Sequence, residues 1–308
     1  ILAYKRIEKE SITEDPFVSS VIGAVQLALQ EKGYFLLLYS NPDMEECVRI
    51  SREWNVDGII LLGAKREGYY KIKESLSVPV VSIDTPFSAE DKDYVNVGLK
   101  DYEAAKEMTK YLLSMGHRKI AFFSLTEGGE LLEKHYIDSE RYRGYKDAME
   151  EEGLSAGVWH NLSFTEEWRK KQYLSFYEEK FFHATALFVT ADIMALEMMR
   201  FCMDRGISIP EQLSIAGFDG IKAGRCMHPM LTTMEQDSAE KGRKAVKELL
   251  SLLSAGACLF ADAGEKQRVI SCKQEKENSR NKVSEVEGKY KNILLPAKLF
   301  FGETVAKI

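Results

Sequence analysis

The hydrophobic positions of this chain form two recurring patterns: short continuous apolar runs, and longer segments in which apolar residues recur at helical spacing. Continuous runs predict strands that are covered by helices on both faces, as in a parallel sheet. In the first part of the chain, strands are expected at residues 1–4, 34–39, 58–62, 78–83, 95–97 and 119–123. Helices are expected between them, at residues 18–33, 44–54, 69–75 and 102–115. This alternation is typical of right-handed βαβ units.

The same alternation starts again after residues 124–126. The expected helices are 139–152, 166–180, 193–205 and 238–253, and the expected extended segments are 158–159, 184–189, 213–216, 231–234 and 292–301. The sequence therefore predicts an α/β fold with two doubly wound parallel-sheet lobes. Such sheets bind ligands beyond the carboxyl ends of their strands, so two facing lobes would form a cleft that closes on a small molecule.

The stretch LSIAGFDG, residues 213–220, contains the clearest candidate for a residue in that cleft. It predicts a buried strand that stops abruptly and leaves the carboxylate of Asp219 where the sheet opens. There the carboxylate can accept hydrogen bonds from ligand hydroxyl groups, or it can cap a turn.

Length and composition agree with a globular protein that has two cores. The chain has 308 residues, of which 45% are hydrophobic and 29% charged, and this length exceeds an ordinary single-core domain. A net charge of −6 argues against a wide face that grips a nucleic-acid backbone. The five cysteines lack ligand spacing, which favours reduced thiols, and no apolar run is long enough to span a bilayer. We therefore expect a cytoplasmic protein.

One segment, residues 255–291, does not fit the alternation. It contains small residues, a candidate strand at 268–271, and a run at 273–289 that is rich in Lys, Glu, Asn and Ser. This composition is typical of a solvated, mobile loop or of an exposed helix. Either a surface insertion without function or a segment that docks a partner would have it.

Motifs for catalysis or cofactor binding are not found in the sequence. There is no G-x-S-x-G turn, no G-x-x-x-x-G-K-[ST] phosphate loop and no H-E-x-x-H pair. Cys226 and His228 are two residues apart but have no third ligand in view. The sequence therefore predicts a binding protein rather than an enzyme, with no cofactor and no metal.

Eight short motifs, spread in order over nearly the whole chain, resemble one family. They are VDGII (56–60), PVVSID (79–84), GHRKIA (116–121), RYRGY (141–145), DIMAL (192–196), SIAGFD (214–219), PMLTT (229–233) and LLP (294–296). Together they resemble the ligand-binding core of LacI-type bacterial transcription regulators, which is similar in fold to periplasmic sugar-binding proteins. GHRKIA and PMLTT are closer to the regulators than to the periplasmic proteins.

The resemblance implies a type I periplasmic-binding-protein-like fold with three crossovers between the lobes, at residues 123–126, 231–234 and 294–297. The N-terminal lobe would comprise residues 1–124 and 234–293, with the insertion at 255–291. The C-terminal lobe would comprise residues 125–233 and 294–308. The helix-turn-helix of these regulators is not found in the sequence, so an upstream DNA-binding domain is expected before Ile1, where the chain opens inside an expected strand.

The function that the resemblance implies is allosteric. A sugar or sugar derivative would bridge the two lobes of a homodimeric, cytoplasmic regulator and control operator DNA through the upstream domain. An extracytoplasmic sugar-binding protein of a transport system is the alternative, and an upstream signal peptide would distinguish it. An enzyme on the same architecture remains a third class.

The resemblance also implies a set of ligand-binding residues, and all of them except Asp15 have a purely structural alternative. Arg141 would present its planar guanidinium to the ligand, or it would form a surface salt bridge. Asp192 would lie at the cleft edge, or it would be an N-cap. The remaining candidates are Asp219, for which a turn cap is the alternative; Asp84, with the same alternative; Phe17 and Phe164, with plain packing as the alternative; and Asp15.

The sequence departs from the family at two places in the expected site. The aspartate that follows the first-lobe strand falls on Lys100, with Asp101 beside it, and neither can be assigned a role from the sequence. The Asn-Asp pair before the M-A-L motif is replaced by Ala191 and Asp192.

Overall fold

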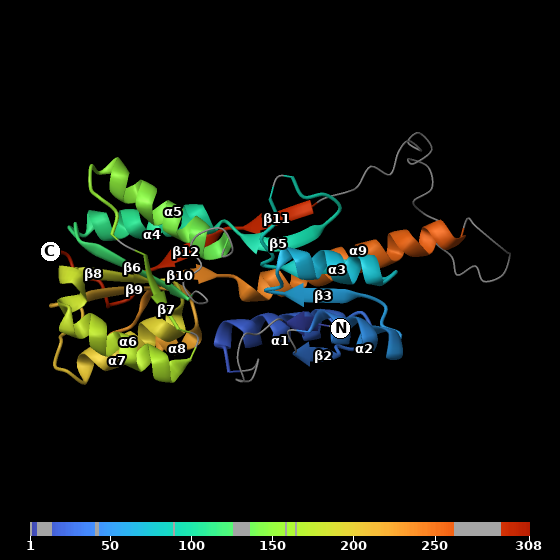
Figure 1. Cartoon of the computed structure of the whole chain (residues 1–308), viewed down its shortest axis with the longest axis horizontal. Coiled ribbons are helices and arrows are strands. Elements are labelled where there is room, and N and C mark those ends of the chain that lie inside the picture. Colours follow the sequence, from blue (N-terminus) through green and yellow to red (C-terminus); the bar gives the residue numbers. More distant parts are fainter. Residues whose placement is uncertain are drawn as a thin grey trace.

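The computed structural model describes residues 2–4, 14–40, 43–88, 90–125, 136–157, 159–163, 165–261 and 291–308. They form two α/β lobes, each with a six-stranded sheet, which lie end to end along the long axis of the molecule (Figure 1). The predicted fold class is confirmed.

The first sheet has the strand order β11-β5-β4-β3-β1-β2, and all of its strands are parallel. Its strands are β1 (Leu2–Tyr4), β2 (Leu38–Ser40), β3 (Ile59–Leu62), β4 (Val80–Ile83), β5 (Val95–Leu99) and β11 (Lys291–Leu295). Its helices are α1 (Pro16–Gln30), α2 (Met44–Glu53), α3 (Arg66–Ser75) and α9 (Ser238–Ala261). Side chains of β3 alternate between the two faces: Ile60 and Leu62 pack with α1 and α9, whereas Ile59 and Leu61 pack with α2 and α3. This two-sided burial explains the continuous apolar runs in the sequence.

The second sheet has the order β12-β10-β9-β8-β6-β7, in which only the β10–β12 pair is antiparallel. Its strands are β6 (Ile120–Leu125), β7 (Trp159–Leu162), β8 (Ala186–Val189), β9 (Ser214–Asp219), β10 (Thr232–Gln236) and β12 (Ala297–Phe300). Its helices are α4 (Asp101–Ser114), α5 (Tyr136–Glu151), α6 (Glu166–Glu178), the 3-10 turn η1 (Lys180–His183), α7 (Asp192–Met203) and α8 (Lys222–Arg225). Helices α4 and α5 pack on each other and cover one face, while α6 and α7 cover the other.

The chain passes between the sheets three times, but two of the predicted crossings are misplaced. The first crossing lies between β5 and α4, at Lys100, because β6 belongs to the second sheet and α4 packs on α5. The boundary predicted at residues 124/125 is therefore wrong. The second crossing lies at Asp237, since β10 as a whole belongs to the second sheet, and the boundary predicted at 233/234 is also wrong. The third crossing is at Pro296, close to the predicted position.

Two further predictions differ from the structure. The strand expected at residues 34–39 is reduced to β2, which pairs with one neighbour at the sheet edge and therefore does not need cover on both faces; Phe35 is 97% exposed. Helix α9 continues to Ala261, so the expected insertion at 255–291 begins as part of that helix. The rest of the insertion, with the candidate strand at 268–271, lies outside the described residues. No helix within the described ranges is long and apolar enough to cross a membrane.

Candidate functional site

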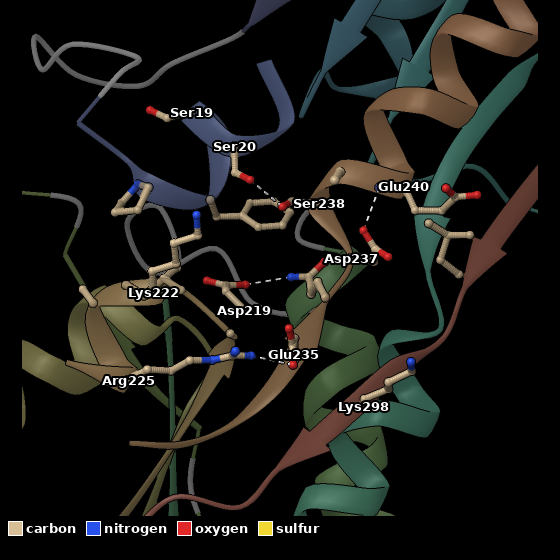
Figure 2. A pocket seen from close by; sticks show the side chains of 18 of the residues that line it. Ser19, Ser20, Asp219, Lys222, Arg225, Glu235, Asp237, Ser238, Glu240 and Lys298 are labelled. Atoms are coloured by element: carbon tan, nitrogen blue, oxygen red, sulfur yellow. Dashed lines mark hydrogen bonds and ion pairs between the residues drawn. The ribbon is translucent and has the colours of Figure 1, made fainter. Parts of the chain in front are cut away.

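A cavity of about 900 Å³ lies between the two lobes. Its first-lobe walls come from the amino-terminal ends of α1 and α9, and its second-lobe walls come from α8, β10, β12 and the turn after β9. Figure 2 shows Asp219 and Lys222 on the second-lobe side, with Ser20 and Ser238 opposite them on the first-lobe helices. The hydroxyl oxygens of Ser20 and Ser238 are 2.7 Å apart, which ties α1 to α9 at the cavity wall. The cavity thus lies at the carboxyl ends of strands, as expected for doubly wound sheets.

The backbone turns sharply where β9 ends at the cavity. Asp219 has a φ of 120°, a strained value for a residue with a side chain, and such strain is common at ligand sites. Gly220 follows with a φ of 74°, and a Cβ atom there would overlap the backbone of β10. The buried carboxylate of Asp192 holds this turn, because its oxygens accept from Ile221 N at 2.8 Å and from Thr233 Oγ1 at 2.6 Å.

A continuous chain of hydrogen bonds joins Asp219 to the first lobe. Gln236 Nε2 donates to Asp219 Oδ1 at 2.7 Å, and Gln236 Oε1 accepts from Lys241 Nζ at 2.7 Å. Lys241 Nζ also donates to both carboxylate oxygens of Asp84, each at 2.7 Å, and it lies 5.2 Å from the ring centre of Phe17. The chain therefore connects the ends of β4, β9 and β10 with α9.

A second polar cluster surrounds Arg141, which is buried in the second lobe near the junction. Its Nε donates to Asp101 Oδ1 at 2.8 Å, its Nη1 donates to Thr190 O at 2.8 Å, and its guanidinium lies 3.8 Å from the centre of the Phe218 ring. Asp138 lies close by and accepts from Thr190 Oγ1 at 3.2 Å. The guanidinium is thus fixed by a carboxylate, a carbonyl and an aromatic face.

Burial raises the pKa of several carboxyl groups at the junction. It raises the pKa of Asp138 to about 6 and that of Asp192 to about 7. Burial also raises the pKa of Asp101 and of Asp219, and in both the positive charge of Arg141 opposes the rise. The carboxyl groups at the junction outnumber the cations, so their burial costs free energy. A ligand rich in hydrogen-bond donors would lower this cost.

The structure brings several of the predicted site residues together at the junction. Phe17 and Asp219 line the large cavity. Asp84 lines a separate, smaller cavity of about 100 Å³ and is bonded to Lys241. Arg141 lies beside these groups, but it is in a buried ion pair with Asp101 rather than on the surface, so the surface salt bridge considered for it is wrong.

The other predicted residues have different surroundings. Asp15 is the N-cap of α1, where its carboxylate accepts from Phe17 N at 2.9 Å and Val18 N at 3.1 Å. Asp192 does not cap α7, since both of its oxygens bind the β9–α8 turn and β10 instead. Phe164 lies outside the described residues.

Four residues of the junction were not among the predicted site residues: Asp101, Asp138, Gln236 and Lys241. Lys241 could have been identified from the sequence. It lies on the apolar stripe of α9, one turn before Ala245 and two turns before Leu249, and only 1% of it is exposed. A lysine on a buried stripe is expected to have a carboxylate partner. No local feature of the sequence marks the other three, because their place at the junction depends on the tertiary fold.

Within the part of the chain that the structure describes, no group of three His, Cys, Asp or Glu residues is placed to hold a metal ion. The junction is instead a set of carboxylate, amide and cationic groups beside aromatic rings. This arrangement suits a neutral ligand with many hydroxyl groups, which the carboxylates and amide bind while an aromatic ring covers its apolar face.

Comparison with known proteins agrees with this geometry. Residues 109–269 match the family described as a periplasmic binding protein-like domain. The transcriptional regulator MalR of Clostridium butyricum is 27% identical over 255 residues, which cover 78% of this chain and 72% of MalR.

Two solved structures have the same fold. A LacI family transcriptional regulator from Enterococcus faecium with bound ribose has a TM-score of 0.74 at 20% identity, covering all of this chain and 99% of that one. The lac repressor dimer bound to operator and an anti-inducer has a TM-score of 0.74 at 18% identity. The match covers 99% of this chain and 93% of the repressor chain. The chain belongs to the periplasmic binding protein-like family, in the form that LacI-type transcriptional regulators contain.

Proposed function

We propose that the chain is the effector-binding core of a transcriptional regulator and that its effector is a sugar or sugar derivative. The observation that carries this proposal is the cavity of about 900 Å³ between the lobes, into which the strained Asp219 presents its carboxylate. The ribose in the Enterococcus faecium relative supports a carbohydrate as the ligand class.

The mechanism is a shift in the population of lobe arrangements. A ligand that contacts Asp219 in the second lobe and Phe17 in the first binds best at one angle between the lobes. Only this difference in affinity drives the change, so the ligand must touch both lobes. We propose that a homodimer passes the change to operator DNA through a domain outside this chain, and that the protein acts in the cytoplasm. The regulators that are similar to this chain support a role in binding rather than in catalysis.

A thermal-shift screen tests the proposed function. Pentoses, hexoses, disaccharides, sugar phosphates and nucleosides are added separately, and we expect at least one sugar to raise the melting temperature, because a ligand that binds only the folded state stabilises it. Calorimetry then checks the affinity and confirms that the sugar is not consumed. If no carbohydrate shifts the transition while another compound class does, the ligand class is wrong.

Replacement of Asp219 by asparagine should weaken binding of that sugar by about 10- to 100-fold, since a hydrogen bond to a charged acceptor contributes about 1.5–3 kcal/mol. The folded protein should remain as stable, because asparagine has the size of Asp219 and keeps an oxygen that can accept from Gln236 Nε2. Asp204→Asn is the matched control, since Asp204 is exposed at the far end of α7 and pairs with Arg200. Equal affinities of the two variants would exclude Asp219 from the site.

A further inference from the structure

Lys241 is a buried cation whose contacts are all directed at the junction. It is the fourth residue of α9, just past the crossing at Asp237, and only 1% of it is exposed. Its three donors are directed at Asp84 Oδ1, Asp84 Oδ2 and Gln236 Oε1, each at 2.7 Å. An ammonium group has three N–H donors, so every one of them has an acceptor in the protein.

This arrangement determines which way the amide of Gln236 points. An amide side chain can present either its oxygen or its NH₂ group in a given direction. Because Lys241 can only donate, it binds Oε1, and the NH₂ group is then directed to Asp219 Oδ1 at 2.7 Å. If the amide were reversed, its NH₂ group would face the donor Lys241 Nζ, and its Oε1 would face the acceptor Asp219 Oδ1.

We propose that Lys241 is a positioning residue of the effector site: it fixes the amide of Gln236, and this amide holds the carboxylate of Asp219 in the orientation that receives the ligand. The inference rests on the proposed function and adds a residue that does not itself line the cavity. It also links the site to the second crossing, since Gln236 ends β10 and Lys241 lies in the first turns of α9, on the two sides of Asp237.

The test has a ligand-free arm that follows the amide directly. The protein is labelled with ¹⁵N at glutamine side chains, and the pair of Nε2 protons of Gln236 is identified from its loss in Gln236→Glu. We expect slow exchange of this pair with water in the parent protein and fast exchange in Lys241→Met. Lys244→Met is the matched control, because Lys244 lies one turn further along α9, is partly exposed and pairs with Glu240.

The pH dependence of the same signal separates positioning from a general loss of packing. The groups that act on Asp219 are Arg141, Asp192, Asp15 and Gln236, and the bond from Gln236 lowers its pKa. Loss of that bond should raise the midpoint of the titration seen at Gln236 by about 0.5–1 pH unit. Lys241→Arg, which keeps a donor, should restore slow exchange and part of the shift.

Removal of one partner from a buried pair destabilises a protein, so Lys241→Met alone can fail to fold. The double variant Asp84→Asn, Lys241→Met removes both charges of the pair, so it can be measured even if the single variant does not fold. It should show the same fast exchange at Gln236 as the single variant.

A ligand arm measures affinity for D-ribose by calorimetry, with an expected loss of about 5- to 30-fold in the double variant, equivalent to about 1–2 kcal/mol. Slow exchange of the Gln236 amide in the absence of Lys241 would overturn the inference, as would a changed amide with an unchanged D-ribose affinity. If the parent protein binds no carbohydrate, the proposed function fails, and the ligand-free arm still decides whether Lys241 positions Gln236 and Asp219.

Discussion

Replacement of Arg141 by alanine should lower the free energy of unfolding at pH 7 by about 3–5 kcal/mol, because it removes one partner of a buried ion pair. The guanidinium contacts Asp101 and lies against Phe218, and its charge also acts on Asp138 and Asp219. Without it, the carboxyl groups of Asp101, Asp138 and Asp219 lose a positive charge that lowers their pKa values. Ligand binding should be lost as well. The surface salt bridge considered from the sequence would contribute little to stability, and the buried position of Arg141 changes that expectation.

The effect of Arg141→Ala should depend on pH. The pKa of Asp138 is raised from 3.8 to about 6, so the folded state binds more protons than the unfolded state between these values, and stability falls as pH rises through this window. Arg141 lowers the pKa of Asp101, Asp138 and Asp219, and its loss therefore makes the fall steeper and extends it above pH 6.

Urea unfolding at pH 4, 5.5 and 7 measures this dependence. The difference between the variant and the parent protein should be smallest at pH 4, where most of the carboxyl groups are protonated. Arg143→Ala is the matched control on the same helix, because Arg143 is exposed and pairs with Glu140, and its effect should stay within about 0.5 kcal/mol. A deficit in Arg141→Ala that is the same at all three pH values would show that packing, not charge, explains the loss.

Replacement of Gly144 by alanine should be the next most damaging change, with a loss of about 2–3 kcal/mol from overpacking. Gly144 lies on α5 where this helix meets α4, and a Cβ atom there would lie 2.2 Å from Tyr102 O and 3.0 Å from Lys106 N. Both contacts are with backbone, so the helices must move apart. Since α5 carries Arg141 and α4 carries Asp101, this movement should also weaken their ion pair.

Gly23→Ala is the control for Gly144→Ala. Gly23 lies in the middle of α1 with no atom within 4 Å of a Cβ, so alanine should leave stability unchanged or raise it by up to about 1 kcal/mol. Chemical denaturation of both variants checks this pair of expectations. If both substitutions stabilise the protein, α4 and α5 do not approach as closely as the structure has them.

The fold followed from the sequence because the two-sided burial of parallel strands leaves a local signal. Runs such as Val80–Ile83 and Ala186–Val189 are apolar at every or nearly every position, and glycines such as Gly144 and Gly220 mark close approaches of backbone. The places where the chain changes lobes leave no such signal. Nothing in the composition of Asp101–Ser114 indicates which sheet that helix covers, and the first crossing was therefore misplaced.

The candidate site was predicted in part for a similar reason. Asp219 ends a buried strand, so local sequence places it at the cleft, whereas Phe17 was assigned there through the resemblance to LacI-type regulators. The partners of these residues come from distant segments: Asp101 reaches Arg141 across 40 positions, and Lys241 reaches Asp84 across 157. Such pairs depend on tertiary packing, which a single sequence does not reveal.

The strand order also has a consequence for the protein as it leaves the ribosome. In the first sheet, β11 pairs with β5, yet it is made almost 200 positions later, after the whole of the second sheet except β12. Until residue 295 has emerged, the edge of β5 has unpaired backbone groups, and α9, which covers one face of that sheet, is also late. The second lobe should thus become compact during synthesis while the first is still incomplete, although most of the first lobe is translated earlier.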